Sequence, residues 1–101
     1  MELAAFQDVI ARTYADRDRE RGIAAAVAWL AEEVGELAQA VRKGSLDQQR
    51  HEVADVLAWL TSIAIQLGVD LDDAAGRYAD DKRESELHAA LFAALHERSN
   101  A

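Results

Sequence analysis

Apolar residues recur at three- and four-residue steps along most of the chain, the spacing of one face of an α-helix. The β-branched residues are scattered and do not alternate at period two, as they would in a half-buried strand. We therefore predict an all-α protein of four helices. Their apolar positions are Leu3, Phe6, Val9, Ile10 and Ala15 in the first; Val27, Leu30, Val34, Leu37 and Val41 in the second; Val53, Val56, Leu60, Ile63 and Leu67 in the third; and Leu71, Ala74, Ala75, Tyr78, Leu87, Leu91 and Leu95 in the fourth.

The ends of the first two helices follow from charge and glycine. The first is predicted over about residues 2–14 or a little beyond. The charged run 16–22 is predicted to be a solvated loop or a frayed turn, although its arginines are also suited to closing over phosphates. The second helix is predicted over about 23–43, and Gly44 is expected to end it in a left-handed conformation.

Capping signals mark the last two helices. Ser45 and Gln48 have the spacing of a capping box, so the third helix should begin directly after Gly44 and end at Gly68. Asp70 is a suitable N-cap for the fourth helix. The leucines at four-residue steps near its end favour packing or a subunit contact.

The composition narrows the class of protein. The chain has 101 residues, half of them hydrophobic and 30% charged, which fits one folded domain spanning residues 1–101. A domain of this size buries a limited share of its surface, so we expect a dimer or a dimer of dimers. The chain contains no cysteine and no apolar run long enough to cross a membrane, which favours a reducing cytoplasm.

The net charge of −8 argues against general binding to nucleic acid. A small anionic ligand can still bind if a metal ion or a local basic patch separates it from the acidic side chains.

Two acidic pairs border the apolar stripes of the two central helices. Glu33 and Glu36 share one flank of the second helix, and Glu52 and Asp55 share the matching flank of the third. A tight turn at Gly44 makes these helices an antiparallel hairpin, in which residues whose numbers sum to about 88 lie at equal heights. Glu33 then faces Asp55, and Glu36 faces Glu52.

Four carboxylates so close together repel one another unless a cation lies between them, because like charges about 4 Å apart cost about 4 kcal/mol at an effective dielectric of 20. Oxygen ligands in an open cluster suit Mg²⁺, with Mn²⁺ as a substitute. His51 heads a His-Glu-x-x-Asp run but lacks the second histidine of zinc hydrolase helices, so we interpret it as an exposed turn residue. The alternative, that the acids form a solvated helix face, is less consistent with their mirrored register.

The same two segments resemble the MazG-type nucleotide pyrophosphohydrolases, a superfamily that also includes dimeric dUTP and dCTP pyrophosphatases and phosphoribosyl-ATP pyrophosphatase. The motifs are Glu-Glu-x-x-Glu within Trp29–Val41 (WLAEEVGELAQAV) and Glu-x-x-Asp within Glu52–Leu60 (EVADVLAWL), and the resemblance covers roughly residues 23–81. It implies hydrolysis of a nucleoside triphosphate to the monophosphate and pyrophosphate, in a role such as removing non-standard or surplus nucleotides.

The resemblance also implies roles for single residues. Glu33, Glu36, Glu52 and Asp55 become Mg²⁺ ligands, with Glu33 also part of the catalytic centre, and Glu32 becomes a candidate for orienting or deprotonating the attacking water. The family's phosphate-contacting stretch corresponds to residues 77–83, where Arg77 stands in place of a common lysine and Asp81 in place of a common asparagine. The residues implied in substrate binding there are Arg77, Lys82 and Arg83.

The residue numbers of Trp29 and Trp59 also sum to 88, so the two tryptophans should lie at equal heights, at the end of the acidic cluster away from the turn. A nucleobase can stack on an aromatic face there. Packing in the core or an interface is the other interpretation of both. Two rival functions remain open at this point: a phosphoribosyl-ATP pyrophosphatase, and a non-catalytic helical module that binds metal or a basic partner.

Overall fold

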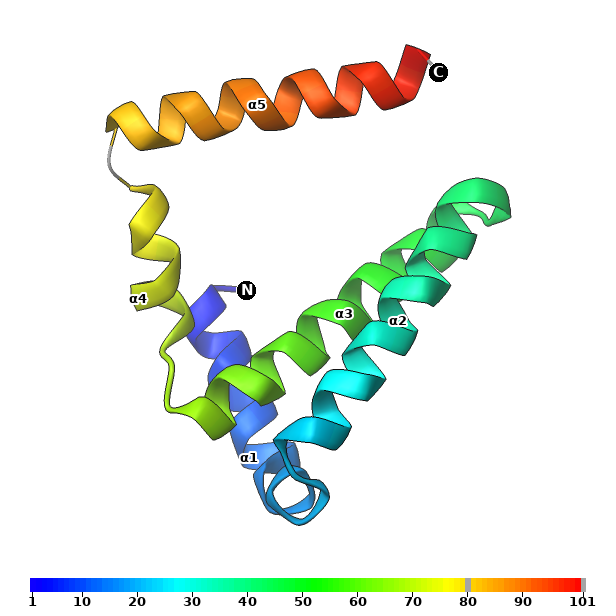
Figure 1. Ribbon diagram of the computed structural model, residues 1–101. Helices are drawn as coiled ribbons and strands as arrows, with labels where there is room; N and C mark the ends of the chain where they lie inside the picture. The colour runs from blue at the N-terminus through cyan, green and yellow to red at the C-terminus, as the bar shows by residue number, and fades with distance from the viewer. Residues whose placement is uncertain (80, 101) are drawn as a thin grey trace. The chain divides into compact units, whose positions relative to one another are not determined.

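The computed structural model describes the backbone of residues 1–79 and 81–100 and the side chains of residues 1–79 and 86–97. It confirms the all-α prediction, with no strand in the part of the chain that it describes (Figure 1). The elements are α1 (Leu3–Arg21), α2 (Ile23–Lys43), α3 (Leu46–Leu67), α4 (Leu71–Ala75), the 3₁₀ turn η1 (Gly76–Tyr78) and α5 (Asp81–Asn100). Contacts divide the chain into two compact units, Met1–Leu71 and Asp72–Ala101. That the two form one domain stays a prediction.

Helix α1 is longer than the sequence pattern indicated. The run 16–21, predicted to be a loop or frayed turn, is helical and ends only at Gly22, whose φ of 86° suits a residue without a side chain. Two ion pairs at helical spacing favour this conformation: Arg19–Asp16 at 2.6 Å and Arg21–Asp18 at 2.9 Å. The alternation of charges that resembled a loop is therefore a set of partners along a helix.

The turn between α2 and α3 confirms the capping box and corrects the glycine. The Ser45 side chain accepts a hydrogen bond from the Gln48 backbone N–H, and the Gln48 Oε1 accepts one from the Ser45 N–H at 2.7 Å. Gly44 is extended, with φ −97° and ψ 172°, and is not left-handed as predicted. A Cβ at this position would lie 2.8 Å from the Ala40 carbonyl oxygen, so close backbone approach explains the glycine.

The end of α3 was predicted correctly, and the fourth helix was not. The Val69 N–H bonds the Ala64 carbonyl and the Gly68 N–H bonds the Ile65 carbonyl, the Schellman pattern of a helix end. The single fourth helix expected from residue 70 onwards is instead divided into α4, η1 and α5. Gly76 begins the 3₁₀ turn, consistent with its poor helix propensity, and the Ala79 N–H bonds the Gly76 carbonyl at 3.0 Å.

Within Met1–Leu71, α1 packs against the C-terminal half of α3. The Gln7 amide fixes one end of this contact, because its Nε2 donates to the Val69 carbonyl at 2.9 Å and its Oε1 accepts from the Leu71 N–H at 2.8 Å. The side chains that become buried in this unit include Ile10 from α1, Ala26 from α2 and Ile63 from α3. The α2–α3 hairpin extends beyond α1 toward its Gly44 turn (Figure 1).

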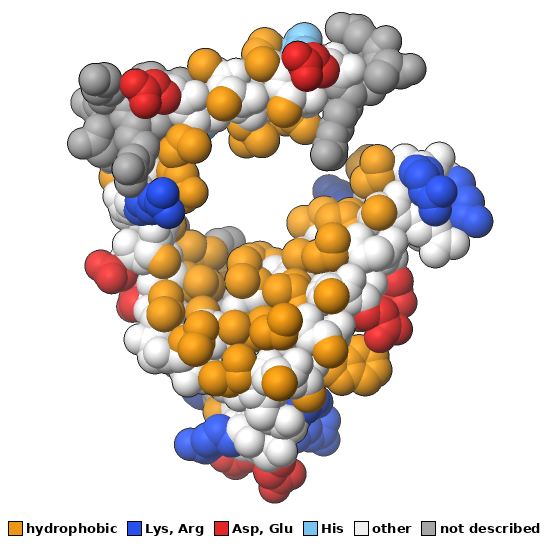
Figure 2. Space-filling model, viewed as in Figure 1, with side chains coloured by type: hydrophobic (Ala, Val, Ile, Leu, Met, Phe, Trp, Pro, Cys, Tyr) orange, Lys and Arg blue, Asp and Glu red, His pale blue; other side chains and the backbone are white. Residues whose placement is uncertain are grey.

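The apolar stripes of α2 and α3 are only partly buried within the chain. Eight large aliphatic residues of these two helices are exposed, Ile23 and Leu67 among them. The other six recur at seven-residue steps: Val27, Val34 and Val41 on α2, and Leu46, Val53 and Leu60 on α3. Val41 is 66% exposed and Leu46 is 68% exposed. Figure 2 shows hydrophobic side chains gathered over the α2–α3 hairpin. We call these six residues the heptad face.

No single helix among the described residues is long and apolar enough to span a membrane. Among the same residues, α3 and Leu71–Tyr78 reach the length and hydropathy of a span when they are taken together.

Candidate functional site

The register of the hairpin is fixed by its two tryptophans. Trp29 on α2 and Trp59 on α3 stack with ring centroids 5.9 Å apart and planes inclined by 10°. Their numbers sum to 88, so the predicted pairing across the hairpin is confirmed at this height. The acidic pairs lie one and two helical turns further toward Gly44.

The structure brings the predicted acids together in two overlapping groups. Carboxylate oxygens of Glu33, Glu36 and Glu52 lie within 4.8 Å of one another. Ligand atoms of His51, Glu52 and Asp55 form a second group within the same limit. Glu52 belongs to both groups, and Asp55 is also close enough to Glu33 to raise its pKa.

Glu33 has the most perturbed environment in this cluster. Burial, and then the charge of Glu36, raise its pKa from 4.5 to about 7, with further contributions from a hydrogen bond to Glu52 and from the charge of Asp55. The Oε2 atoms of Glu33 and Glu52 are buried and lack a hydrogen-bond partner among the described residues. Buried acceptors without donors are costly, so these two oxygens call for a proton or a cation.

These residues fit a hard divalent cation. Glu33, Glu36 and Glu52 offer carboxylate oxygens as donors, and two of these residues each carry a buried oxygen without a hydrogen-bond partner. Mg²⁺ takes one or a few carboxylates and keeps several waters, which suits an open cluster on a helix pair. That Glu33, Glu36, Glu52 and Asp55 hold it remains a proposal.

His51 differs from its predicted setting. It is exposed, as predicted, but it lies within α3 and not in a turn. Its Nε2 is 3.1 Å from the Asp55 Oδ2, so the imidazole can hold that carboxylate in place. The i,i+4 spacing of His51 and Asp55 was visible in the sequence, but its meaning depended on how far the helix extends.

The remaining predicted site residues are Glu32, in the same compact unit as the acids, and three basic residues in the unit Asp72–Ala101. Glu32 is exposed on α2 and belongs to neither acidic group. Arg77 lies in η1, where its guanidinium is 5.7 Å from the centre of the Tyr78 ring. The side chains of Lys82 and Arg83 lie outside the described residues. The functional roles of all three basic residues stay predictions.

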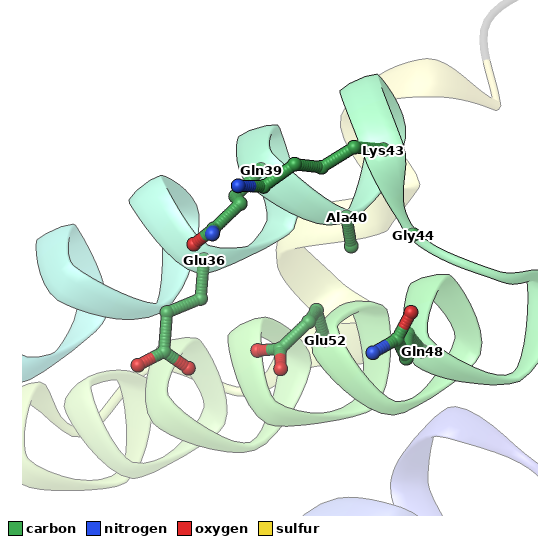
Figure 3. Close-up of a pocket in the computed structure, with 7 residues that line it drawn as sticks. All are labelled: Glu36, Gln39, Ala40, Lys43, Gly44, Gln48 and Glu52. Atoms are coloured by element: carbon green, nitrogen blue, oxygen red, sulfur yellow. The ribbon is translucent and has the colours of Figure 1, made fainter.

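A cavity of about 320 Å³ opens on the Gly44 side of the acids. Glu36 and Glu52 form its inner end, and the cation Lys43 and the amides of Gln39 and Gln48 line the rest (Figure 3). The capping box engages the Gln48 Oε1, which leaves the Nε2 on the side toward Glu52. This cavity therefore offers hydrogen-bond donors and one positive charge next to the acids.

A second cavity, of about 240 Å³, lies on the other side of the acids, between α1 and α3. Asp55 lines it, together with Trp59 and the nearly buried Ser62 from the same helix. From α1 come Asp18 and Arg21, and the Arg21 guanidinium lies 4.8 Å from the centre of the Trp59 ring. We call it the α1–α3 cavity.

Sequence reasoning assigned no site to several of the residues that line the two cavities. Lys43 was predicted only to lie at the end of the second helix and Gln48 only to take part in a capping box, and both predictions are correct but incomplete. Asp18 and Arg21 were assigned to a loop. Their three-residue spacing within the charged run was the available signal, because it matches an ion pair on a helix.

Comparison with known proteins bears on what this arrangement does. No curated protein matches the chain significantly. A profile of the MazG nucleotide pyrophosphohydrolase domain matches residues 21–85, more than half of the chain, and this span contains both acidic pairs, both tryptophans and Lys43. The chain therefore belongs to the MazG nucleotide pyrophosphohydrolase family.

Proposed function

We propose that this protein hydrolyses a nucleoside triphosphate to the nucleoside monophosphate and pyrophosphate in a Mg²⁺-dependent reaction. The observation that carries the proposal is the convergence of the Glu33, Glu36 and Glu52 carboxylates in a chain of the MazG family. Glu33 and Glu52 each also have a buried oxygen without a hydrogen-bond partner. Nucleotide pools depleted of non-standard or surplus triphosphates would be the physiological result.

In this proposal Glu33, Glu36, Glu52 and Asp55 hold the divalent ion between α2 and α3. A bound Mg²⁺ supplies neutralisation of phosphate oxygens and a lower pKa for a bound water. The protein residues keep the ion in a fixed position, because each acid projects from a helix whose register is set by the Trp29–Trp59 stack and the Ser45–Gln48 capping box.

The cavity with Lys43 is the proposed place of the β- and γ-phosphates. Its donors are the Lys43 ammonium and the amides of Gln39 and Gln48, and phosphate oxygens are acceptors. Because Glu36 and Glu52 end this cavity, phosphates bound there lie directly beside the ion that the acids hold.

The water that attacks the α-phosphorus requires a carboxylate to orient it and accept its proton. Glu32 is the proposed residue for this step. Its exposed position on α2, next to Glu33 in the chain, leaves its side chain available to a bound substrate.

We further propose that the active form is a dimer or a dimer of dimers. The heptad face carries apolar residues every seven positions on two antiparallel helices, the spacing by which helices pack knobs into holes. A second copy that packs the same face against it would bury these six residues in a four-helix bundle.

A panel of canonical and modified nucleoside triphosphates, incubated with Mg²⁺, tests the proposed reaction. Phosphorus NMR of the products should show pyrophosphate and a nucleoside monophosphate. Release of phosphate with a nucleoside diphosphate would overturn the assignment to the α–β bond. Turnover of phosphoribosyl-ATP but of no common triphosphate would instead identify the biosynthetic pyrophosphatase, and thermal stabilisation by Mg²⁺ without any product would identify a non-catalytic metal-binding module.

A further inference from the structure

Asp18, one of the residues that line the α1–α3 cavity, carries a buried acceptor that the described residues do not satisfy. Asp18 is only 3% exposed, and its Oδ1 bonds the Arg21 Nη1 at 2.9 Å. Its Oδ2 is buried and has no hydrogen-bond partner among the described residues. A carboxylate oxygen in this position can only accept, so a ligand that reaches it must present an N–H or O–H donor.

The charges around Asp18 restrict the ligand further. A phosphate would place its oxygens against the Asp18 and Asp55 carboxylates, and an ammonium ion would lie beside the guanidinium groups of Arg17 and Arg21. A neutral donor avoids both repulsions. Tyr14 and Trp59 both line the cavity, and aromatic lining favours a flat, aromatic ligand.

The position of the cavity indicates which part of a nucleotide enters it. Asp55 joins it to the acidic cluster, and the cavity with Lys43 lies at the Glu36 and Glu52 end of the same cluster. A nucleotide whose phosphates lie beside the acids and Lys43 has only its nucleoside end left for the α1–α3 cavity. At about 240 Å³ this cavity is smaller than the roughly 300–1,000 Å³ of pockets for drug-sized ligands. It suits a base, and not a whole nucleotide.

We propose that the α1–α3 cavity is the nucleobase site and that the Asp18 Oδ2 accepts a hydrogen bond from the exocyclic amino group of a base such as cytosine or adenine. The inference rests on the proposed function for its orientation of the substrate. Uracil and thymine present carbonyl oxygens where cytosine presents its amino group, and a carboxylate repels them. Asp18 is therefore a specificity-determining residue, held in place by Arg21.

Metal-free protein and two neutral nucleosides, 2′-deoxycytidine and 2′-deoxyuridine, test the proposal without any catalysis. Proton–nitrogen NMR resolves one indole N–H signal for each tryptophan, and a Trp29→Phe variant identifies the signal of Trp59. Deoxycytidine should shift the Trp59 signal, and its Kd should be about ten- to a hundredfold lower than that of deoxyuridine. This ratio corresponds to the free energy of one hydrogen bond to a charged group. Equal affinities, or no binding of either nucleoside at millimolar concentration, would overturn the proposal.

Asp18→Asn reverses the chemistry with little change of shape. Its amide oxygen still accepts from Arg21, while an N–H₂ donor replaces the Oδ2. Deoxycytidine binding should weaken about ten- to a hundredfold, whereas deoxyuridine binding should hold or strengthen. The matched control is Asp16→Asn, because Asp16 pairs with Arg19 on the same helix at the same spacing but lies outside the cavity. If both variants lower deoxycytidine binding equally, the effect belongs to helix α1 and the proposal is wrong.

The two proposals fail in different ways. Discrimination between the nucleosides by the metal-free protein, with no triphosphate hydrolysed, would retain the base site and remove the proposed reaction. Hydrolysis of dCTP and dUTP with equal kcat/KM, unchanged by Asp18→Asn, would retain the reaction and remove the base site.

Discussion

Trp29 and Trp59 lie face to face across the α2–α3 hairpin, with ring centroids 5.9 Å apart. This stack fixes the relative heights of the two helices, and a slip of one residue would rotate the acids of one helix by about 100° relative to those of the other. The capping box at Ser45 fixes the opposite end of the hairpin. The acidic cluster is thus held from both sides by groups that take no part in binding the ion.

Glu36→Gln and Glu32→Gln should separate metal binding from catalysis. Loss of the Glu36 ligand should lower kcat/KM about a hundredfold or more, since even outer-sphere partners of metal ligands are worth about ten- to a hundredfold. It should also weaken Mg²⁺ binding, measured by calorimetry.

Glu32→Gln should lower kcat about 10²- to 10⁴-fold, the usual contribution of a general base, with Mg²⁺ affinity unchanged. Wild-type activity and Mg²⁺ affinity in Glu36→Gln would show that the metal site is misplaced.

The metal-free protein should become less stable as the pH rises from 4.5 to 7. The pKa of Glu33 is raised from 4.5 to about 7 by burial and by neighbouring carboxylates, so the folded state keeps a proton in this window that the unfolded state has lost. Its stabilising contribution is complete below pH 4.5 and is lost as the pH passes 7. Thermal unfolding in the presence of a chelator measures the effect.

The matched variant for this pH dependence is Glu33→Gln, whose Tm should decline less over the same window. Excess Mg²⁺ should reverse the trend in the wild type, because the ion binds the deprotonated carboxylates and therefore stabilises the folded state more at higher pH. A wild-type Tm that rises with pH in the chelator would contradict the assignment of Glu33 as the strained group.

Val34→Lys should dissociate the proposed dimer. Val34 lies at the middle of the three heptad-face residues on α2, and burial of a valine is worth about 1.5–3 kcal/mol. The substitution occurs in both copies, so the dimer Kd should rise about a hundredfold or more. Light scattering coupled to gel filtration measures the mass. Val9→Lys, an exposed valine on α1 away from this face, should leave the mass unchanged.

Two glycine-to-alanine substitutions should change stability in opposite directions. At Gly44 the new Cβ would meet the Ala40 backbone at 2.8 and 2.9 Å, so the variant should lose about 1–3 kcal/mol. At Gly35, inside α2, the new Cβ would meet nothing within 4 Å apart from the backbone of its own helix, and better helix propensity should add up to about 1 kcal/mol. Denaturant unfolding of both variants provides the comparison. A stabilised Gly44→Ala protein would contradict the close approach seen in the turn.

The sequence by itself determined the helical class, the α2–α3 hairpin and the register of its acids. The signals behind these predictions are local, and each acts within one or two helical turns. They are the three- and four-residue spacing of the apolar positions, the Ser45–Gln48 capping box and the positions of Gly44 and Gly68. Counting residues outward from the turn then sufficed to pair Trp29 with Trp59, because both antiparallel helices have the same rise per residue.

Only the tertiary structure decided which surfaces these helices share with α1. Two properties of the charged run depend on packing between segments about forty residues apart. One is whether Asp18 and Arg21 lie in a loop or on a helix, and the other is that Asp18 is buried and lines a cavity together with Trp59 and Ser62. The exposure of the heptad face is likewise a tertiary property. An apolar stripe has the same sequence pattern whether it is buried within its own chain or exposed for contact with a second chain. Local pattern specifies a helix and its faces, but burial is a relation between faces that are distant in the sequence.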